Sequence, residues 1–260
     1  MIPQSYQHAL DSGVYLPGVD TSTVGERVPV DPSTIGAPAV LLIIGQSNGG
    51  NHGDVRRAAK GPVYNFNPFD GYCYRANDPL LGATGDGGSP WCLLGDGLVA
   101  DGLASSVLLA PLCVGGAAVA EWAPGGPYNH RMSYCLRRLR EVGFSPTHVL
   151  WHQGEADALY GTKAEIYCQS FQEMIASLRE LDITAPVYVA IASHFSIPPG
   201  YAAQQRVIRQ AQRSLRNPDA DIFLGPDTDM IGHRYDGCHI GGEGIVAHAN
   251  AWRRVLAVSA

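Results

Sequence analysis

From Ala39 onward, short apolar runs alternate with longer amphipathic stretches. The apolar runs leave no polar face, so each predicts a strand buried on both sides of a parallel sheet. Five such strands are predicted, at 39–45, 107–114, 147–153, 187–193 and 221–225. The amphipathic stretches predict helices at roughly 91–105, 129–142, 163–181, 200–216 and 242–257. The expected fold class is therefore α/β, a three-layer α/β/α sandwich around a five-stranded parallel sheet.

Two stretches lack this periodicity. Residues 1–38 are rich in Pro, Gly, Ser and Thr, and they are predicted to form an N-terminal surface extension. Residues 39–260 contain no break in composition and are predicted to form a single domain. Within that domain, residues 48–90 are also aperiodic. Because long structureless connections are uncommon in compact domains unless they are functional, this segment is interpreted as active-site loops.

The composition excludes several classes of partner. With 260 residues, 45% of them hydrophobic, the chain can bury a full core. A formal net charge of -6 gives no general attraction for nucleic acid or anionic membranes. No apolar run is long enough for a membrane helix, and the first residues lack the pattern of a signal peptide. We expect a soluble protein, cytoplasmic by default or secreted if a leader has been removed.

The cysteines do not form a metal-binding or redox motif. There are six, without a CxxC pair, and several lie in apolar runs, which favours buried free thiols. Cys73 and Cys92 flank a glycine-rich loop and could form a disulfide in a secreted protein. The spacing alone leaves the two states open.

The turn that follows the first predicted strand carries a candidate nucleophile. Ser47 lies between Gly45-Gln46 and Asn48-Gly49, so small neighbours allow a tight turn and the close approach of a substrate. In a parallel sheet, functional residues gather at the carboxyl ends of the strands. A phosphate-binding glycine turn or an ordinary loop serine explains this motif equally well.

Two further strand ends offer groups that stabilise negative charge. Gly115 and Gly116 follow the second strand, and their N–H groups could serve as oxyanion donors, although a turn needing positive φ also explains them. Gln153 follows the third strand and carries a side-chain amide that could donate in the same way. Glu155 and Asp157 come just after it, and helix capping is the preferred interpretation for Asp157.

The segment before the last predicted helix supplies a candidate base. A serine hydroxyl needs an imidazole to accept its proton, and a carboxylate to orient that imidazole. Asp236 and His239 lie three residues apart across a glycine-containing turn, so the carboxylate can reach Nδ1 while Nε2 faces Ser47. The alternative is an exposed turn with an incidental histidine. The chain order Ser, Asp, His matches a known order of triad residues.

Together these segments resemble a known enzyme family. GQSN at 45–48, VGGAAVAEW at 114–122, VLWHQGEAD at 149–157 and DGCHI at 236–240 are similar to the SGNH hydrolases. The similarity is to their branch of carbohydrate esterase family 6 and sialate O-acetylesterases. It implies a flavodoxin-like parallel sheet, no cofactor, and release of acetyl groups from an acetylated sugar or polysaccharide.

The resemblance also implies roles for individual residues. Ser47 matches the nucleophile, His239 the base and Asp236 the orienting acid. The oxyanion hole falls on the Ser47 N–H, on Gly116 in preference to Gly115, and on the Gln153 side chain. The chain departs from the common pattern in having Gly49 where many relatives have Met, and Ala117 where Ser or Thr is usual. The first departure is expected to widen the acyl pocket, and the second to remove one hydrogen bond to substrate.

Two other functions compete with the serine esterase. A metal-dependent hydrolase would use a run of potential ligands whose spacing fits no standard zinc signature: Asp227, Asp229, His233, Asp236 and His239. A carbohydrate-binding protein on the same fold would use four aromatic side chains as stacking faces: Trp91, Trp122, Tyr128 and Tyr160. Neither a GxGxxG nor a Walker motif supports a nucleotide site. No pattern predicts an oligomeric state.

Overall fold

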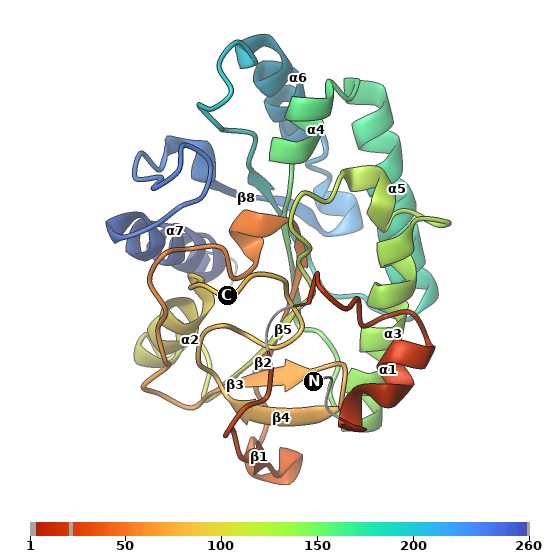
Figure 1. The fold of residues 1–260 in the computed structure, drawn as a ribbon, viewed down its shortest axis with the longest axis vertical. Helices are drawn as coiled ribbons and strands as arrows, with labels where there is room; N and C mark the ends of the chain where they lie inside the picture. The colour runs from red at the N-terminus through yellow and green to blue at the C-terminus, as the bar shows by residue number, and fades with distance from the viewer. Residues whose placement is uncertain (1–3, 21–22, 259–260) are drawn as a thin grey trace.

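A computed structural model describes residues 4–20 and 23–258, and these form a mixed α/β fold around one eight-stranded sheet (Figure 1). The strand order across the sheet is β1-β4-β3-β5-β2-β6-β7-β8. The strands are β1 Pro29–Val30, β2 Ala39–Gly45, β3 Val63–Asn67, β4 Tyr72–Arg75, β5 Val107–Pro111, β6 His148–His152, β7 Val187–Ile191 and β8 Ile222–Asp227. The six strands from β3 to β8 in this order run parallel, whereas β4 and β1 are antiparallel to their neighbours.

Helices cover both faces of the sheet. The described helices are α1 Gln7–Asp11, α2 Trp91–Ala100, α3 Pro127–Glu141, α4 Glu155–Tyr160, α5 Ala164–Glu180, α6 Ala202–Ser214 and α7 Glu243–Val258. Alternate residues of β2 point to opposite faces: Leu42 packs in the cluster beneath α3, α5 and α6, and Leu41 in the cluster beneath α2 and α7. Figure 1 shows α2 and α7 on one side of the sheet and α3 and α5 on the other. None of the described helices has the length and apolar composition of a membrane span.

The five predicted strands and five predicted helices are present, but the sheet has eight strands instead of the predicted five. The segment 48–90, interpreted as loops, contains β3 and β4. Its apolar pattern is broken by Asn65 and Asn67, which are nevertheless buried. The Asn65 amide is fully used, because it accepts from the Leu81 N–H and donates to the Phe66, Leu81 and Leu109 carbonyls. A buried asparagine that bonds backbone looks like loop sequence although it lies in a strand.

The residues before β2 are also more ordered than their composition predicts. Tyr6, just before α1, is buried in a small aromatic cluster with Tyr15 and Phe69, and β1 pairs with β4. A buried ion pair joins Asp20 to Arg131 of α3 at 2.7 Å. Composition conceals these contacts because each partner lies far away along the chain.

The cysteines are free thiols, as the apolar surroundings predicted. The spacing had left a Cys73–Cys92 disulfide as one of two possibilities, and in the structure both residues are free cysteines. Cys73 packs in the core cluster on the α3 and α5 face, and Cys92 in the cluster on the α2 and α7 face. The sheet therefore separates the two sulfur atoms.

The topology fixes where a site can form. β2 lies at the centre of the sheet between β5 and β6, so the chain leaves β2 toward one side and later returns on the other. Such a point, where the strand order reverses, opens a crevice at the carboxyl ends of the strands. The segments that follow β2, β5 and β6 therefore meet there.

Candidate active site

The turn after β2 is fixed by a glycine and an amide. Gly45 has φ +143°, and a Cβ there would lie 2.0 Å from the His152 carbonyl oxygen, so only glycine allows β2 and β6 to approach this closely. The Gln46 side-chain oxygen accepts from the N–H groups of Gly154 and Ala156, at 3.1 and 3.0 Å. Ser47 then begins a short 3-10 turn, Ser47–Gly49, and is 5% exposed. The serine is thereby held at the carboxyl end of the central strand.

Asn48, the residue after the serine, holds the histidine segment next to this turn. Its Oδ1 accepts from the Ile240 N–H at 2.9 Å, and its Nδ2 donates to the Cys238 carbonyl at 3.2 Å. The residues on both sides of His239 are thus bonded to the neighbour of Ser47. Nδ2 also donates to Glu155 Oε1 at 2.7 Å. One amide therefore joins segments from β2, from the start of α4 and from the loop before α7.

Asp236 orients the His239 ring. Its Oδ2 lies 2.6 Å from His239 Nδ1, and its Oδ1 accepts from the backbone N–H groups of Cys238 and His239. Partial burial raises the pKa of Asp236, but the hydrogen bonds from the His239 ring and the two N–H groups outweigh it and lower the pKa below its usual value. The carboxylate is therefore charged at neutral pH and fixes a proton on Nδ1, which leaves Nε2 as the basic atom.

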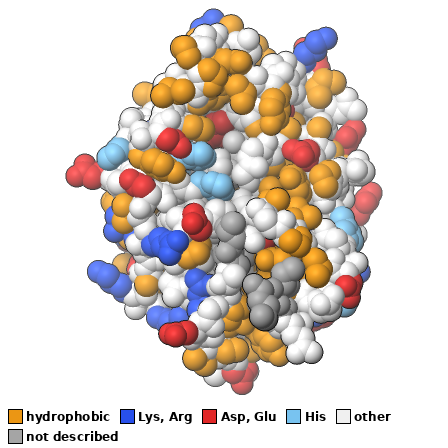
Figure 2. Space-filling view, in the orientation of Figure 1, with side chains coloured by type: hydrophobic (Ala, Val, Ile, Leu, Met, Phe, Trp, Pro, Cys, Tyr) orange, Lys and Arg blue, Asp and Glu red, His pale blue; other side chains and the backbone are white. Residues whose placement is uncertain are grey.

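Ser47 and His239 line the same cavity of about 310 Å³, which we call the Ser47 cavity. It is lined by Gln46, Ser47, His52, Gly115, Gly116, Glu155, Ala156, Leu159, Tyr160, Phe195, Ile197, Pro198, Cys238 and His239. Neither Lys nor Arg is among these described residues. In the space-filling view, histidine side chains lie close to acidic ones near the centre of the face, with hydrophobic side chains above them (Figure 2).

The two glycines after β5 have different environments. The Gly115 N–H donates to Thr84 Oγ1 at 2.8 Å. Gly116 has φ +72°, which favours glycine, and lines the cavity. Within the described part of the chain, the N–H groups of Gly116 and Ser47 donate to no protein acceptor. These two N–H groups are therefore free to bind an anion at the cavity wall.

Gln153 is not brought to the cavity. It is fully buried, and its Nε2 donates to the Ala117 carbonyl at 3.0 Å and to Asp157 Oδ2 at 2.5 Å. Gln46 Oε1 lies 3.3 Å from the same nitrogen. All three neighbours are acceptors, so the amide hydrogens are engaged within the protein, and Gln153 is not among the residues that line the Ser47 cavity. Gln153 connects the turn after β5 to α4 from behind the site.

Two residues at the site, His52 and Thr84, escaped the sequence analysis, and a third, Glu155, was noticed there without a role being assigned to it. The His52 ring stacks on the His239 ring, with centroids 5.3 Å apart, and its Nε2 lies 3.1 Å from Thr84 Oγ1. Glu155 lines the cavity with Oε2 buried and without a partner in the described residues. The only signal in the sequence was the place of Glu155 beside Gln153. His52 and Thr84 lie in aperiodic sequence, where no spacing rule relates them to His239.

The metal alternative finds no support in the geometry. Asp227 and Asp229 both pair with Arg209, at 2.7 and 2.5 Å, and Asp229 also accepts from the Ser193 and His194 N–H groups. Within the described residues, 4–20 and 23–258, no three His, Cys, Asp or Glu side chains converge to hold an ion. Two carboxylates of the predicted ligand set, Asp227 and Asp229, are therefore paired with arginine, whereas Asp236 pairs with His239.

The aromatic platform proposed for a carbohydrate-binding protein is mostly core. Trp91 and Trp122 are fully buried, and Tyr128 packs against Trp122 at 5.2 Å between ring centroids. Tyr160 is the exception, since it is 64% exposed and lines the Ser47 cavity. Of these four aromatic side chains, Tyr160 is the one that is both exposed and part of the Ser47 cavity lining.

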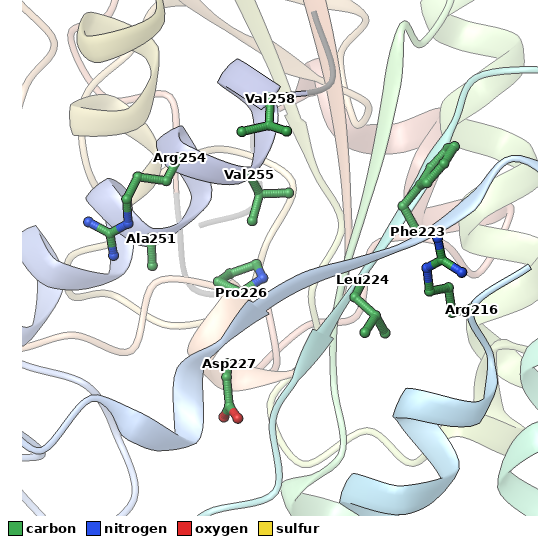
Figure 3. A pocket seen from close by; sticks show the side chains of 9 residues that line it. All are labelled: Arg216, Phe223, Leu224, Pro226, Asp227, Ala251, Arg254, Val255 and Val258. Carbon is green, nitrogen blue, oxygen red and sulfur yellow. The ribbon is translucent and has the colours of Figure 1, made fainter. Parts of the chain in front are cut away.

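A second cavity, of about 560 Å³, lies between the edge strand β8 and α7, and we call it the β8–α7 cavity. Phe223, Leu224, Pro226 and Asp227 of β8 line it, together with Ala251, Arg254, Val255 and Val258 of α7 and with Arg216 (Figure 3). Its lining offers no serine, cysteine or histidine. The candidate nucleophile Ser47 and the candidate base His239 both line the smaller cavity.

Comparison with known proteins gives a family and a fold. A family model described as "Carbohydrate esterase, sialic acid-specific acetylesterase" matches residues 38–254. The comparison with curated proteins gave no match.

Among solved structures, a protein from Arabidopsis thaliana is 19% identical with a TM-score of 0.70, and the match covers 85% of this chain and 99% of that one. NanS is 15% identical with a TM-score of 0.59, covering 86% and 98%. A carbohydrate acetylesterase from Xanthomonas citri is 18% identical with a TM-score of 0.56, covering 85% of this chain and 56% of that longer one. At these identities the three structures establish a shared fold.

Proposed function

The chain belongs to the carbohydrate esterase family of sialic acid-specific acetylesterases and is a carboxylic ester hydrolase; from this premise we propose that Ser47, His239 and Asp236 form its catalytic triad. The observation that supports this most is the pair of bonds from Asn48 to Cys238 and Ile240, which holds His239 beside the Ser47 turn. The bond of Asp236 to His239 Nδ1 supports the assignment of Nε2 as the base.

In the proposed reaction, His239 Nε2 takes the proton of the Ser47 hydroxyl as the oxygen attacks the acetyl carbonyl carbon. The N–H groups of Ser47 and Gly116 donate to the oxyanion that forms. The tetrahedral intermediate collapses, and the sugar oxygen leaves with the proton from His239. Water then attacks the acetyl-enzyme with the same base, which releases acetate and restores the Ser47 hydroxyl.

Gln153 takes an indirect part in this proposal. The resemblance implied that the Gln153 side chain is an oxyanion donor. In the structure its amide nitrogen donates to the Ala117 carbonyl and to Asp157. Asp157 Oδ2 in turn accepts from the Val119 N–H at 2.8 Å. Gln153 and Asp157 therefore support the segment that follows Gly116, and through it the position of the Gly116 N–H.

The lining of the cavity favours a neutral acetylated carbohydrate. Binding a sugar carboxylate calls for an Arg or Lys, and the described lining has neither. The carboxylates present, Glu155 in the wall and Asp236 behind His239, would repel an anionic sugar. Tyr160 offers an exposed ring on which an uncharged sugar can stack. Glycines 115 and 116 near Ser47 suit a short acyl group.

Two assays test this proposal. A series of p-nitrophenyl esters from C2 to C8 should give the highest kcat/KM with acetate. Acetylated xylose should be hydrolysed with a kcat/KM at least about tenfold above that of 9-O-acetylated sialic acid, since one unpaired buried charge costs more than a factor of ten. A preference for the sialic acid would contradict the neutral substrate, and hydrolysis that survives Ser47→Ala would contradict the triad.

A further inference from the structure

His52 is a second imidazole in the Ser47 cavity, and the mechanism above does not use it. Its ring lies nearly parallel to the His239 ring, with an angle of 19° between the planes and 5.3 Å between the centroids. The His52 carbonyl accepts from the Tyr235 hydroxyl at 2.9 Å, so its backbone is bonded to the loop that carries His239. Ring and backbone both connect residue 52 to the segment of the proposed base.

The other edge of the His52 ring reaches the oxyanion turn. Nε2 lies 3.1 Å from Thr84 Oγ1, and the same oxygen accepts from the Gly115 N–H at 2.8 Å. Thr84 is 3% exposed, so water does not compete well for its hydroxyl. A continuous chain of contacts therefore runs from His239 through His52 and Thr84 to Gly115, the residue before the free Gly116 N–H.

The charge of His52 suits this place. Burial, and then repulsion from His239, lower the pKa of His52 to about 4, against the smaller opposing attraction of Asp86 and Asp236. The ring is therefore neutral at pH 7. A neutral ring stacked on His239 does not repel the imidazolium that forms there during catalysis, and its π face attracts it.

We propose that His52 is a positioning residue that, through its ring and through Thr84, holds the base His239 and the Gly115–Gly116 oxyanion turn in fixed relation to each other. The inference rests on the proposed function, because it concerns the geometry of that same reaction. It adds two residues, His52 and Thr84, that act through other groups and do not touch the reacting atoms.

The test separates the ring from the hydrogen bond. His52→Phe keeps an aromatic face beside His239 and removes the nitrogen that meets Thr84, and Thr84→Val removes the hydroxyl at nearly constant shape. Each should lower kcat roughly five- to tenfold, the equivalent of about one hydrogen bond, while KM changes less than about twofold. Because both substitutions break the same link, kcat of the double variant should be no lower than kcat of the more impaired single variant. His52→Ala also removes the ring face and should lower kcat further than His52→Phe.

A second measurement does not depend on activity. Hydrogen exchange of the Gly115 amide, followed by NMR, should accelerate by about tenfold in His52→Phe and in Thr84→Val. The matched control is His148→Phe, because His148 is also a half-buried histidine stacked on an aromatic ring, at 6.0 Å from Tyr188, but at the opposite end of β6. That variant should change neither kcat nor the Gly115 exchange.

The outcomes distinguish the two proposals. Unchanged Gly115 exchange in His52→Phe, or losses in kcat that simply add in the double variant, would overturn the link through Thr84. Esterase activity that persists in Ser47→Ala would overturn the proposed function instead. The exchange measurement would still decide whether the link through Thr84 exists. If the His52 variants change only KM or thermal stability and leave kcat unaltered, His52 has a structural role and the inference is wrong.

Discussion

Two cavities of this molecule, the Ser47 cavity and the β8–α7 cavity, differ in a way that volume does not predict. The β8–α7 cavity is the larger, about 560 Å³ against about 310 Å³ for the Ser47 cavity. Its only carboxylate, Asp227, is paired with Arg209 and Arg213. The Ser47 cavity instead gathers a hydroxyl, two imidazoles and free N–H groups from three separate segments, 46–52, 115–116 and 238–239. Convergence of reactive groups, and not empty space, marks the candidate site.

The difference follows from position in the sheet. β8 is an edge strand, so only β7 and the helices beside it contribute to its surroundings. β2 is central, and the segments after β5 and β6 meet at its carboxyl end. A central strand at a reversal of strand order therefore collects functional groups that an edge strand does not. The following substitutions test this contrast, beginning with the largest expected effect.

Ser47→Ala should remove the activity of the Ser47 cavity almost completely. We expect kcat for p-nitrophenyl acetate to fall by more than about 10⁴-fold, because the proposed acyl-enzyme forms on the Ser47 hydroxyl oxygen, which alanine lacks. Stopped-flow measurement with an excess of enzyme would show whether an acetyl-enzyme still accumulates. Residual activity within tenfold of the wild type would place the reaction elsewhere.

Asp236→Asn should lower kcat less than Ser47→Ala does, but still strongly. The amide cannot stabilise the His239 imidazolium, so we expect kcat to fall about 10²-fold, less than for a buried triad acid because this side chain is 39% exposed. Because the pKa of Asp236 is lowered below the usual aspartate value, its carboxylate is charged at neutral pH and loses that charge only as the pH falls through the lowered pKa. In the wild type, activity lost between about pH 5 and 7 should therefore not come from Asp236, and a kcat/KM profile against pH would check this.

Tyr160→Ala tests the mouth of the cavity. Loss of the exposed ring should raise KM for an acetylated xylo-oligosaccharide by roughly three- to tenfold, the range of one aromatic contact, and leave kcat nearly unchanged. Ethyl acetate, which has no sugar to stack, should show no change, and Tyr160→Phe should behave like the wild type. An equal loss on both substrates would indicate damage to the site and not to sugar binding.

Arg254→Ala, in the β8–α7 cavity, should have the smallest effect. Arg254 is exposed and lines the β8–α7 cavity, which shares no lining residue with the Ser47 cavity, so kcat/KM should stay within about twofold of the wild type. Steady-state kinetics on the same two esters would measure it. A tenfold loss would mean that the larger cavity takes part in the reaction and would break the comparison.

The sequence was informative where its signals are local or repeat with a fixed period. β2 was predicted to the residue, and the five helices to within a few residues except at the carboxyl end of α2, because burial on both faces leaves uniform apolar runs and helix amphipathicity recurs every three to four residues. Ser47 and Asp236-His239 stood out because short motifs around a nucleophile and a base carry their own geometry. The three-residue spacing of Asp236 and His239 does bring the carboxylate to Nδ1.

Only the tertiary structure decided the rest, because the decisive contacts join residues far apart along the chain. β3 was missed because its buried Asn65 bonds the distant backbone of Leu81, which no apolar pattern records. The Gly115 N–H is engaged by Thr84 while the Gly116 N–H is free, and Gln153 turns toward Asp157. His52 and His239 are separated by 187 residues but stack at 5.3 Å. A side chain's chemistry is written in the sequence, whereas the direction in which it points is set by the neighbours that the fold supplies.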